Sequence, residues 1–272
     1  MQIGTRNFDV KNCTYIMGIL NVTPDSFSDG GKFNSLDKAM QHTQQMIDEG
    51  VDIIDVGGES TRPGYTLLDD EEEISRIAPV IEKLKQNFDV PISLDTYKSK
   101  VAKAGIEAGA DLINDIWGLK YDDALAKVIA ENNVSCCLMH NRNNTDYTDF
   151  LTGVLDDMQE TVNIAHNTGI KDEKIMLDPG IGFGKTYEQN LIMLKNLKVL
   201  DKFGYPLLLG ASRKSVIGNT LNLPADERLE GTIATSVMAV MNGYAFVRVH
   251  DVKENKRAVK MALAVRNSGR RF

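Results

Sequence analysis

The chain has 272 residues, a length that suits one large domain or two small ones. Its residues are 42% hydrophobic and 25% charged, as is ordinary for a soluble globular protein with a sizeable core. Its formal net charge of −7 argues against a nucleic-acid or membrane-surface partner that binds through bulk electrostatics. The first residues lack a basic segment followed by an apolar one, so we expect no signal peptide, and no apolar run reaches membrane-spanning length.

Apolar runs and helical patterns alternate along the chain. Residues 1–13 are short and mixed and are expected to form a small hairpin or cover. Eight apolar runs of strand length follow: Tyr15–Val22, Val51–Val56, Val90–Leu94, Asp111–Ile116, Val134–Met139, Ile175–Asp178, Pro206–Leu209 and Ala245–Val249. Eight helical patterns alternate with them: Ser35–Glu49, Asp70–Phe88, Lys98–Ala108, Asp122–Glu131, Asp149–Asn167, Tyr187–Leu197, Asp226–Asn242 and Lys253–Val265.

This alternation predicts a parallel sheet covered by helices. Eight strand–helix units in roughly 250 residues predict a closed (β/α)8 barrel, the TIM barrel, as a single domain over residues 1–272. An open doubly wound sheet is the alternative, but no unit breaks the alternation. The longest irregular segments are Thr23–Asn34, Gly57–Leu68 and His140–Thr148. All three follow strands, so they are expected to be functional lids at the C-terminal rim.

The three cysteines are Cys13, Cys136 and Cys137. Adjacent residues of a strand point to opposite faces, so a bridge between Cys136 and Cys137 is not expected. We expect free thiols in a reducing cytoplasm.

The segment Ile175–Lys185 begins as a short apolar run and continues with a proline and three glycines. It is not a P-loop, because the glycine required five positions before Gly184 is Pro179, and a dinucleotide fingerprint would need glycine in place of Lys185. We interpret it as a buried strand that carries Asp178 to a rim, followed by a glycine-rich turn that lets the backbone approach a ligand. The alternative is a tight strand-to-helix connection with an Asp cap.

Functional side chains stand at the ends of the predicted strands, where barrel enzymes carry their active sites. They are Asn21, Asp55, Asp95, Asn114, Asp115, Met139, His140, Asp178, Arg248 and His250, and the seventh strand leads into Gly210–Ser215. Buried carboxylates are costly unless they are paired, so the agreement among strands indicates a site rather than structural plugs.

Two groups of opposite character are expected in this site. Asp95, Asn114 and Asp178 are hydrogen-bond acceptors that suit a heterocycle with several N–H donors. A cationic group suits a phosphate, which barrels often hold after their last two strands. It comprises Arg62, Arg213, Lys214, Arg248 and His250. The alternative for Arg213 and Lys214 is a solvated loop pair, and the alternative for His250 is a neighbour of a helix N-cap. No nucleophilic Ser or Cys with a paired His is evident, so no covalent intermediate is expected.

A metal hydrolase is the other barrel interpretation. Neither His-x-His at the first strand end nor His-Glu-x-x-His is present, and His42, His140, His166 and His250 have no ligand spacing. A hard cation held by Asn21 and a substrate phosphate is compatible with the sequence.

Two long segments, Gly18–Gly31 and Asp55–Gly64, resemble the signature segments of the dihydropteroate synthase family. The family pattern continues in the same order through Asn114–Ile116, Leu177–Gly184, Gly210–Ser215 and Arg248–Asp251. The chain departs from it after His140, where Asn141–Thr145 replaces a turn that often contains Gly or Gln.

The resemblance implies a (β/α)8 transferase that joins p-aminobenzoate to 6-hydroxymethyl-7,8-dihydropterin diphosphate and releases pyrophosphate in folate biosynthesis. It also implies a Mg²⁺ cofactor bound at Asn21, a cytoplasmic homodimer, and inhibition by sulfonamides. The implied catalytic residues are Asp95, Asp178, Lys214, Arg248 and His250. The implied pterin site is Asp95, Asn114, Ile116, Met139, Asp178, Phe183, Gly210 and Lys214. The implied diphosphate site is Asn21, Arg62, Arg248 and His250, and the implied p-aminobenzoate site is Phe27, Thr61, Pro63, Phe183 and Ser215.

Two alternatives share the pterin slot. A pterin-dependent methyltransferase has no diphosphate to hold, which the Ser60–Gly64 segment and the pair Arg248 and His250 argue against. A non-catalytic pterin-binding paralogue would not need two long loops at the rim.

Overall fold

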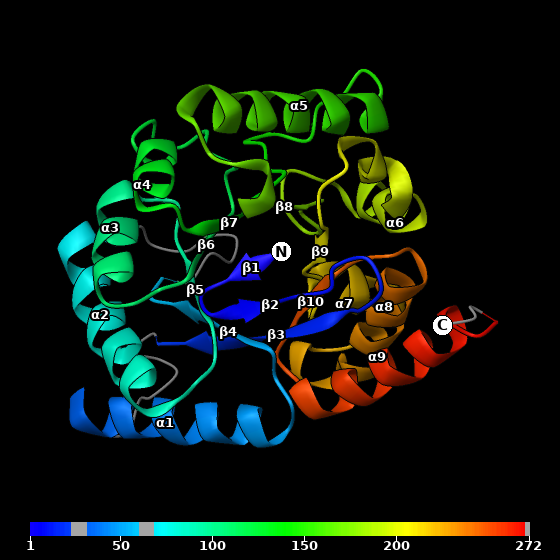
Figure 1. Cartoon of the computed structure of the whole chain (residues 1–272). Coiled ribbons are helices and arrows are strands. Elements are labelled where there is room, and N and C mark those ends of the chain that lie inside the picture. The colour runs from blue at the N-terminus through cyan, green and yellow to red at the C-terminus, as the bar shows by residue number, and fades with distance from the viewer. Residues whose placement is uncertain (23–31, 60–67, 270–272) are drawn as a thin grey trace.

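A ring of parallel strands surrounded by helices forms the molecule (Figure 1). The computed structural model describes residues 1–22, 32–59 and 68–269. The strands lie in the order β8-β7-β6-β5-β4-β3-β10-β9. Their bounds are β3 Tyr15–Asn21, β4 Ile53–Gly57, β5 Ile92–Asp95, β6 Leu112–Asp115, β7 Ser135–Met139, β8 Ile175–Asp178, β9 Leu208–Leu209 and β10 Phe246–Val249. A parallel bridge between Leu177 and Leu207 closes the ring, so the predicted (β/α)8 barrel is confirmed.

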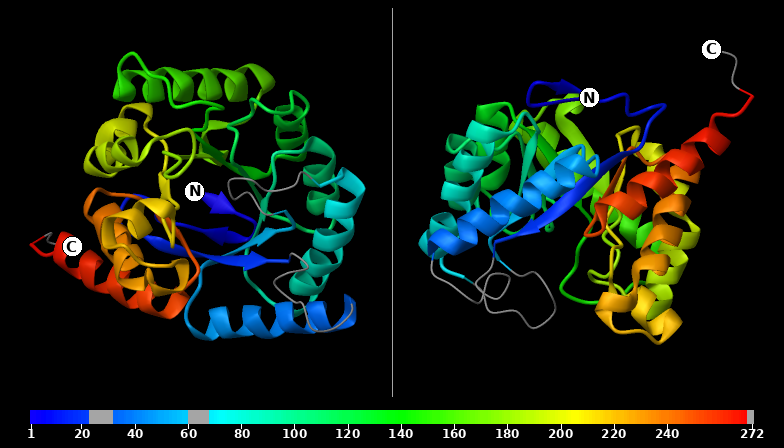
Figure 2. Two further views of the ribbon diagram at one scale, coloured as in Figure 1. Left: turned by 180° about the vertical axis from the view of Figure 1, so that it is seen from behind. Right: turned by 90° about the horizontal axis from the view of Figure 1, so that it is seen from below.

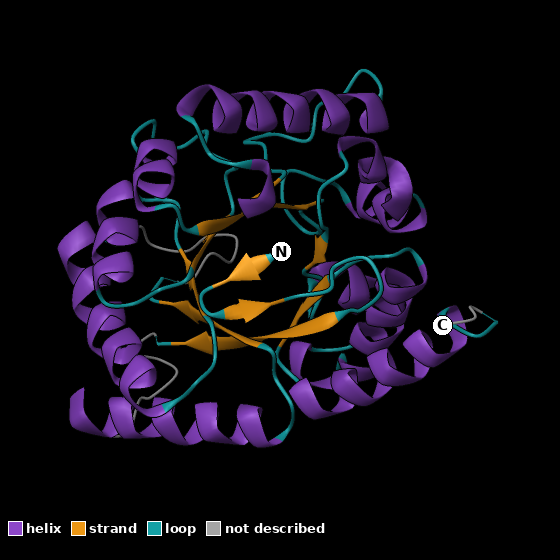
Figure 3. Cartoon of the chain, in the orientation of Figure 1, coloured by secondary structure: helices purple, strands orange, loops and turns teal. Residues whose placement is uncertain are grey.

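The helices lie outside the strands, as Figure 3 shows. Those that the structure describes are α1 Lys32–Asp48, α2 Asp70–Asn87, α3 Ser99–Glu107, α4 Leu125–Asn132, α5 Phe150–Thr168, α6 Tyr187–Lys195, α7 Ser215–Leu221, α8 Leu229–Met241 and α9 Val252–Arg266. Short 3₁₀ turns occupy Asp172–Lys174, Leu197–Phe203 and Ala225–Glu227.

Both faces of the strands are buried, which explains their near-continuous apolar sequences. Adjacent side chains point to opposite faces. In β4, for example, Ile53 belongs to the cluster inside the barrel, whereas Ile54 belongs to the larger cluster between strands and helices. The barrel interior is therefore a packed core and not a channel.

A two-stranded hairpin covers the end of the barrel at which the strands begin (Figure 2, right). Its strands, β1 Gln2–Ile3 and β2 Arg6–Asn7, pair antiparallel. Ile3 is fully buried and Phe8 nearly so, and both pack against inward side chains such as Met17 and Phe246. Because this end is filled by apolar side chains, a ligand site is expected at the opposite, carboxyl end of the strands.

Local signals in the sequence fix the helices that flank this end. The Asp149 carboxylate caps α5 by accepting a hydrogen bond from the amide of Thr152. Thr186 and Gln189 form a reciprocal capping box at the start of α6. As a result, α6 begins directly after the glycine-rich turn that follows β8.

Three differences from the sequence-based prediction have local causes. The helix predicted from Asp122 begins at Leu125, because the Asp122 carboxylate instead accepts hydrogen bonds from the amides of Ser99 at 2.7 Å and Ala124 at 2.9 Å. The helix predicted from Asp226 begins at Leu229, after a 3₁₀ turn. Helix α7 was not predicted, since seven residues are too few to show a clear helical period.

The cysteines and the helices agree with the expectations from composition. Cys13, Cys136 and Cys137 are all free. Among the described residues, no helix combines the length and the apolar character that crossing a membrane would require.

Candidate active site

The carboxyl ends of the parallel strands bring the predicted polar residues to one rim. Asn21 lies opposite Gly57, Gly57 opposite Asp95, and Asp95 opposite Asn114 in the register of four consecutive strands. Side chains that share a register position point to the same face of a sheet. The neighbouring strands therefore place Asn21, Asp95 and Asn114 side by side around the mouth of the barrel.

Arg248 is at the centre of the charged groups. Its Nε donates to Asp55 Oδ2 and its Nη2 donates to Asp95 Oδ2, both at 2.6 Å. Asn114 Nδ2 also donates to Asp55 Oδ2, at 3.3 Å. The acceptor and cationic groups predicted as two separate sets are therefore in direct contact, because β10 adjoins β3 and its side chain reaches across the barrel end.

Two buried oxygens in this cluster have no hydrogen-bond partner among the described residues: Asp55 Oδ1 and Asp95 Oδ1. Buried polar atoms are nearly always paired, so such atoms call for an explanation. Burial raises the pKa of Asp95 to about 7, although Arg248 opposes the shift. A ligand with N–H donors would satisfy Asp95 Oδ1 and favour its ionised form.

Asp178 ends β8 on the other side of the rim. Its Oδ1 accepts a hydrogen bond from the amide of Gly180 at 2.7 Å. A Cβ on Gly210 would lie 3.4 Å from Asp178 Oδ2, so a glycine at this position keeps the approach to the carboxylate open. Burial raises the pKa of Asp178, and the nearby charge of Lys214 opposes that shift.

A separate apolar cluster stands beside these carboxylates. Tyr97, Ile116 and Met139 are buried in it, and Trp117 and Phe183 pack against it. Three of the five residues are ones that the family resemblance assigns to a pterin slot. Acceptors on one side and flat apolar surface on the other suit a planar heterocycle with polar edges.

Lys214 approaches the slot from the segment after β9. Its Nζ donates to the carbonyl oxygen of Ile181 and lies 4.5 Å from the centroid of the Phe183 ring. Burial lowers the pKa of Lys214 to about 8. Arg213 has a left-handed φ of 57° and pairs with Asp251 at 2.5 Å. The two neighbouring cations therefore have different partners, and neither forms the solvated loop pair that was the alternative.

His250 lies next to Ser212, a contact that the sequence did not indicate. Ser212 Oγ is 2.9 Å from His250 Nδ1, and it also accepts a hydrogen bond from the backbone amide of His250 at 3.2 Å. The sequence showed no such pair, because the residues are 38 positions apart and meet only where neighbouring strands β9 and β10 end. The contact holds the imidazole at the start of the turn before α9.

Other predicted residues have structural roles or lie elsewhere. Asp115 faces away from the slot. Its two carboxylate oxygens accept hydrogen bonds from the backbone amides of Trp117 at 2.7 Å and Leu119 at 2.6 Å. Ser215 is the exposed first residue of α7. Four predicted residues, Phe27, Thr61, Arg62 and Pro63, lie outside the described residues, as do large parts of two of the predicted lids.

The third predicted lid, His140–Thr148, is tied to its neighbours in the structure. Arg142 binds the Asp157 carboxylate of α5 through two nitrogens, at 2.5 and 3.0 Å. The Tyr147 hydroxyl donates to the carbonyl of Gly184 at 2.8 Å. These bonds make the segment part of the wall behind β8, a role that its length alone did not indicate.

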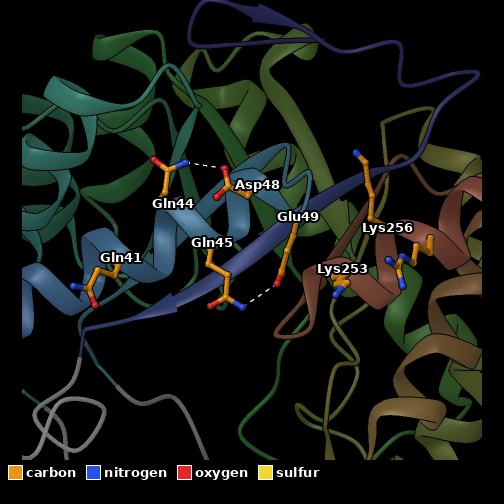
Figure 4. Close-up of a pocket in the computed structure, with 8 residues that line it drawn as sticks. Gln41, Gln44, Gln45, Asp48, Glu49, Lys253 and Lys256 are labelled. Carbon is orange, nitrogen blue, oxygen red and sulfur yellow. Dashed lines mark hydrogen bonds between the residues drawn. The ribbon is translucent and has the colours of Figure 1, made fainter.

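A polar groove on the outer wall is distinct from this site. It lies between α1 and α9 (Figure 4), where Gln44 donates to Asp48 at 2.8 Å and Gln45 to Glu49 at 2.9 Å. Lys256, on its α9 side, binds Asp52 at 2.6 Å. None of the strand-end residues lines the groove, so it takes no part in the candidate site.

The turn after β8 supplies a first testable prediction. Gly180 has a left-handed φ of 69°, and a Cβ there would lie 1.9 Å from the carbonyl oxygen of His140. Gly243 has a similar φ of 86° with nothing within 4 Å of a Cβ. Both alanine variants incur the left-handed penalty, but only Gly180→Ala adds a backbone clash, so we expect losses of about 3–5 and 1–2 kcal/mol respectively. Urea unfolding measures both values, and equal losses would contradict the packing described.

Known proteins resemble the chain over nearly its whole length. The profile of the family described as "Pterin binding enzyme" matches residues 17–250. The dihydropteroate synthase of Clostridium beijerinckii is 62% identical, over 96% of this chain and 97% of that protein. The Bacillus subtilis dihydropteroate synthase is 53% identical, over 95% and 91%.

Solved structures of dihydropteroate synthases share the fold of this chain. Dihydropteroate synthase from Clostridium difficile, solved in the presence of pteroic acid, has a TM-score of 0.93 and 52% identity, and the match covers 95% of this chain and 99% of that one. The Yersinia pestis enzyme, solved in a complex with a sulfonamide drug, has a TM-score of 0.91 and 41% identity, covering 98% and 99%. The chain therefore belongs to the dihydropteroate synthase family of pterin-binding enzymes.

Proposed function

We propose that the protein is the transferase that joins p-aminobenzoate to 6-hydroxymethyl-7,8-dihydropterin diphosphate, forming dihydropteroate and pyrophosphate. The family membership supports the reaction class. The substrate assignment rests on Asp95: one of its oxygens binds Arg248, and the other is buried without a partner among the described residues. A carboxylate held in this way is prepared to accept an N–H from the pterin edge while a cation stands beside it.

The pterin would lie between the acceptors and the apolar cluster. The N–H and amino groups of the pterin would donate hydrogen bonds to Asp95, Asn114 and Asp178. Its two faces would contact Ile116, Met139 and Phe183. Gly210 would leave room at the edge beside Asp178. Lys214, which lies over the Phe183 ring, would bind a ring acceptor on the same ligand.

In the proposed reaction, the bond between the pterin methylene carbon and the diphosphate oxygen breaks, and the electron pair leaves with pyrophosphate. Arg248 and His250, together with Arg62 outside the described residues, would bind the leaving group. The positive charge left on the pterin would be stabilised by the fixed carboxylates of Asp95 and Asp178, a preorganised electrostatic effect.

The amine nitrogen of p-aminobenzoate would then form the new bond to the methylene carbon and lose one proton to solvent. An aromatic amine is largely unprotonated at neutral pH, so no strong general base is needed. Phe27, Thr61, Pro63, Phe183 and Ser215 are the residues proposed to receive this substrate, on the family resemblance. Sulfonamides would compete for the same place.

Magnesium fits the residues at the rim only as a sparsely coordinated ion. If Gly57 carried a Cβ, that atom would lie 3.6 Å from Asn21 Oδ1 and 3.7 Å from the Cβ of Asp95. Asn21 and Asp95 therefore lie on either side of the same glycine at the rim. The described residues contain no group of three or more His, Cys, Asp or Glu side chains that could hold a metal. We propose that Asn21 holds Mg²⁺, which takes its other ligands from water and the diphosphate and supplies positive charge to the leaving group.

The function is tested by measuring pyrophosphate release with dihydropterin diphosphate, Mg²⁺ and p-aminobenzoate. Release that depends on p-aminobenzoate, with a coupled product, is the expected result. No release from a protein that still binds the pterin would instead support the methyltransferase or the binding paralogue.

The same assay tests the metal. Removing divalent ions with EDTA should abolish pyrophosphate release, and added Mg²⁺ should restore it. Asn21→Ala should raise the Mg²⁺ concentration needed for half-maximal activity but leave binding of the pterin alcohol, which lacks the diphosphate, unchanged. Full activity in EDTA would contradict a role for the ion.

We also propose that the protein is a cytoplasmic homodimer. Three free cysteines are compatible with a reducing compartment. Large apolar side chains are exposed on adjacent helices α8 and α9, namely Met238, Met241, Met261 and Val265. Sedimentation should give about twice the chain mass of 30.1 kDa, and Met261→Asp should shift the protein toward the monomer. A monomer in the unaltered protein would exclude this proposal.

A further inference from the structure

A chain of buried polar side chains from α5 and from the segment after β7 lies against the glycine-rich turn that follows β8. Lys185, the last residue of the turn, is only 9% exposed, and His140 is fully buried. Lys185 Nζ is 2.7 Å from His140 Nδ1, and His140 Nε2 is 2.9 Å from Asp157 Oδ2. Arg142 binds the same carboxylate. The reaction proposed above uses none of these four residues.

The partners of Lys185 match its donors one for one. Besides His140, its Nζ bonds the carbonyl oxygens of Gly180 at 2.9 Å and Phe183 at 3.0 Å. An ammonium group has three N–H donors, and both carbonyls can only accept. An ammonium group at Lys185 satisfies all three contacts when His140 Nδ1 is unprotonated, although burial lowers the pKa of Lys185 to about 7.

Asp157 selects that state of His140. Burial raises the pKa of Asp157, but the hydrogen bonds from His140 and Arg142 outweigh it and keep this pKa well below its usual value. The carboxylate is therefore ionised and accepts a hydrogen bond from the Nε2–H of His140. Burial lowers the pKa of His140 to about 4, which keeps the ring neutral. With the proton on Nε2, the other ring nitrogen has a lone pair that faces Lys185.

The turn that Lys185 holds carries several groups of the pterin slot. Gly180 donates its amide to Asp178 Oδ1 at 2.7 Å, Phe183 contributes its ring, and Ile181 contributes the carbonyl that binds Lys214. The Gly180 carbonyl also accepts the amide of Phe183 at 3.1 Å. Both carbonyls that Lys185 binds are thus bonded to, or part of, residues that shape the slot.

We propose that Lys185, oriented by His140 and Asp157, is a positioning residue for the dihydropterin: it holds the turn so that Asp178 and Phe183 face the ligand. The inference rests on the proposed function, because it assumes that the slot binds a pterin. It predicts a larger loss for the pterin than for p-aminobenzoate, because Phe183 is the only residue of the proposed p-aminobenzoate site that lies on this turn.

The test compares Lys185→Met, which keeps the length of the side chain and removes its donors, with Lys195→Met on the exposed face of α6. The dissociation constant for dihydropterin diphosphate is measured by calorimetry, and KM for each substrate by steady-state kinetics. For Lys185→Met we expect the pterin dissociation constant to rise about 10- to 100-fold, with KM for p-aminobenzoate changed much less. Lys195→Met should match the unaltered protein.

A dissociation constant within twofold of the unaltered protein in folded Lys185→Met, or equal losses for both substrates, would overturn the inference. If Lys185→Met does not fold, Asp157→Asn replaces it, because that carboxylate is partly exposed and its loss should weaken pterin binding in the same direction. Unchanged pterin binding in Asp157→Asn would then overturn the inference. If the unaltered protein binds the pterin but releases no pyrophosphate, the proposed function fails while the binding comparison still tests Lys185. An unaltered protein that does not bind the pterin overturns both.

Discussion

Replacing Asp95 with asparagine is expected to lower kcat/KM for dihydropterin diphosphate by about 1,000-fold or more while the fold survives. The carboxylate has two functions that an amide cannot combine. One oxygen binds Arg248 at 2.6 Å, and the other is buried without a partner among the described residues. In the variant, the amide oxygen would stay with Arg248 and the NH₂ group would then point at the N–H donors of the pterin. The variant also lacks the negative charge that stabilises the pterin cation.

A matched control lies at the opposite end of the same barrel. Asp111 accepts a hydrogen bond from the backbone amide of Ile92 at 2.9 Å and forms an ion pair with Lys85. Asp111→Asn therefore makes the same chemical change as Asp95→Asn, but away from the site. Its kcat/KM should stay close to that of the unaltered protein. Near-normal turnover in Asp95→Asn, or equal losses in both variants, would remove the support for the assigned pterin site.

The pH dependence gives an independent check on Asp95. Because burial raises its pKa to about 7, the ionised form that accepts an N–H is lost as the pH falls through this value. Pterin affinity in the unaltered protein should therefore decrease below about pH 7, over the window between this pKa and the ordinary value near 4. In Asp95→Asn this decrease should be absent, and its persistence would assign the titration to another group.

Much of the architecture could be predicted, because it depends on local patterns. Continuous apolar runs separated by helical patterns require a sheet that is covered on both faces, and eight such units close into a barrel. The same logic places strand-end residues such as Asp95 and Asp178 at one rim. Alternation along a strand also explains why Asn114 faces the slot while Asp115 faces away from it.

The pairing of side chains across the barrel could not be predicted in the same way. Arg248 binds Asp55 from 193 positions away and Asp95 from 153 positions away. A strand-end position indicates the rim that a residue reaches, but it does not indicate which opposite charge its side chain will contact. Asp55 was therefore recognised only as a strand-end residue, and its bond to Arg248 was missed. Arg213 was grouped with Lys214 on sequence alone, although its left-handed backbone directs it to Asp251.

The buried Lys185 was missed for a related reason. At the sequence level it was only the residue that breaks a dinucleotide fingerprint. Its three acceptors come from a turn that folds back on itself and from His140, which lies on a different strand end. Motif comparison tests for the presence of a residue type, whereas this role depends on three-dimensional closure of the turn.

Replacing Arg248 with methionine should remove both stability and activity, because the same guanidinium serves the fold and the site. The fully buried carboxylate of Asp55 and the largely buried one of Asp95 would lose the partner that each now has at 2.6 Å. Breaking a buried ion pair by removing one member typically costs 3–5 kcal/mol, so we expect a loss of about that size in urea unfolding at neutral pH. Turnover should fall by about 1,000-fold or more, since the leaving diphosphate would also lose one of the cations proposed to bind it.

The two effects of Arg248→Met can be separated with a second substitution. Asp55→Asn removes one of the stranded charges and leaves Asp95, the proposed pterin ligand, in place. In the double variant we expect at least about 1 kcal/mol of the lost stability to return through coupling of the two contacting residues, with no recovery of turnover. Arg248→Lys should behave in an intermediate way, because one ammonium group cannot bridge two carboxylates with the planar geometry of a guanidinium. If Arg248→Met kept near-normal turnover, the diphosphate would have to be held elsewhere. If the double variant were no more stable than the single one, the pairing with Asp55 would not be what stabilises the barrel end.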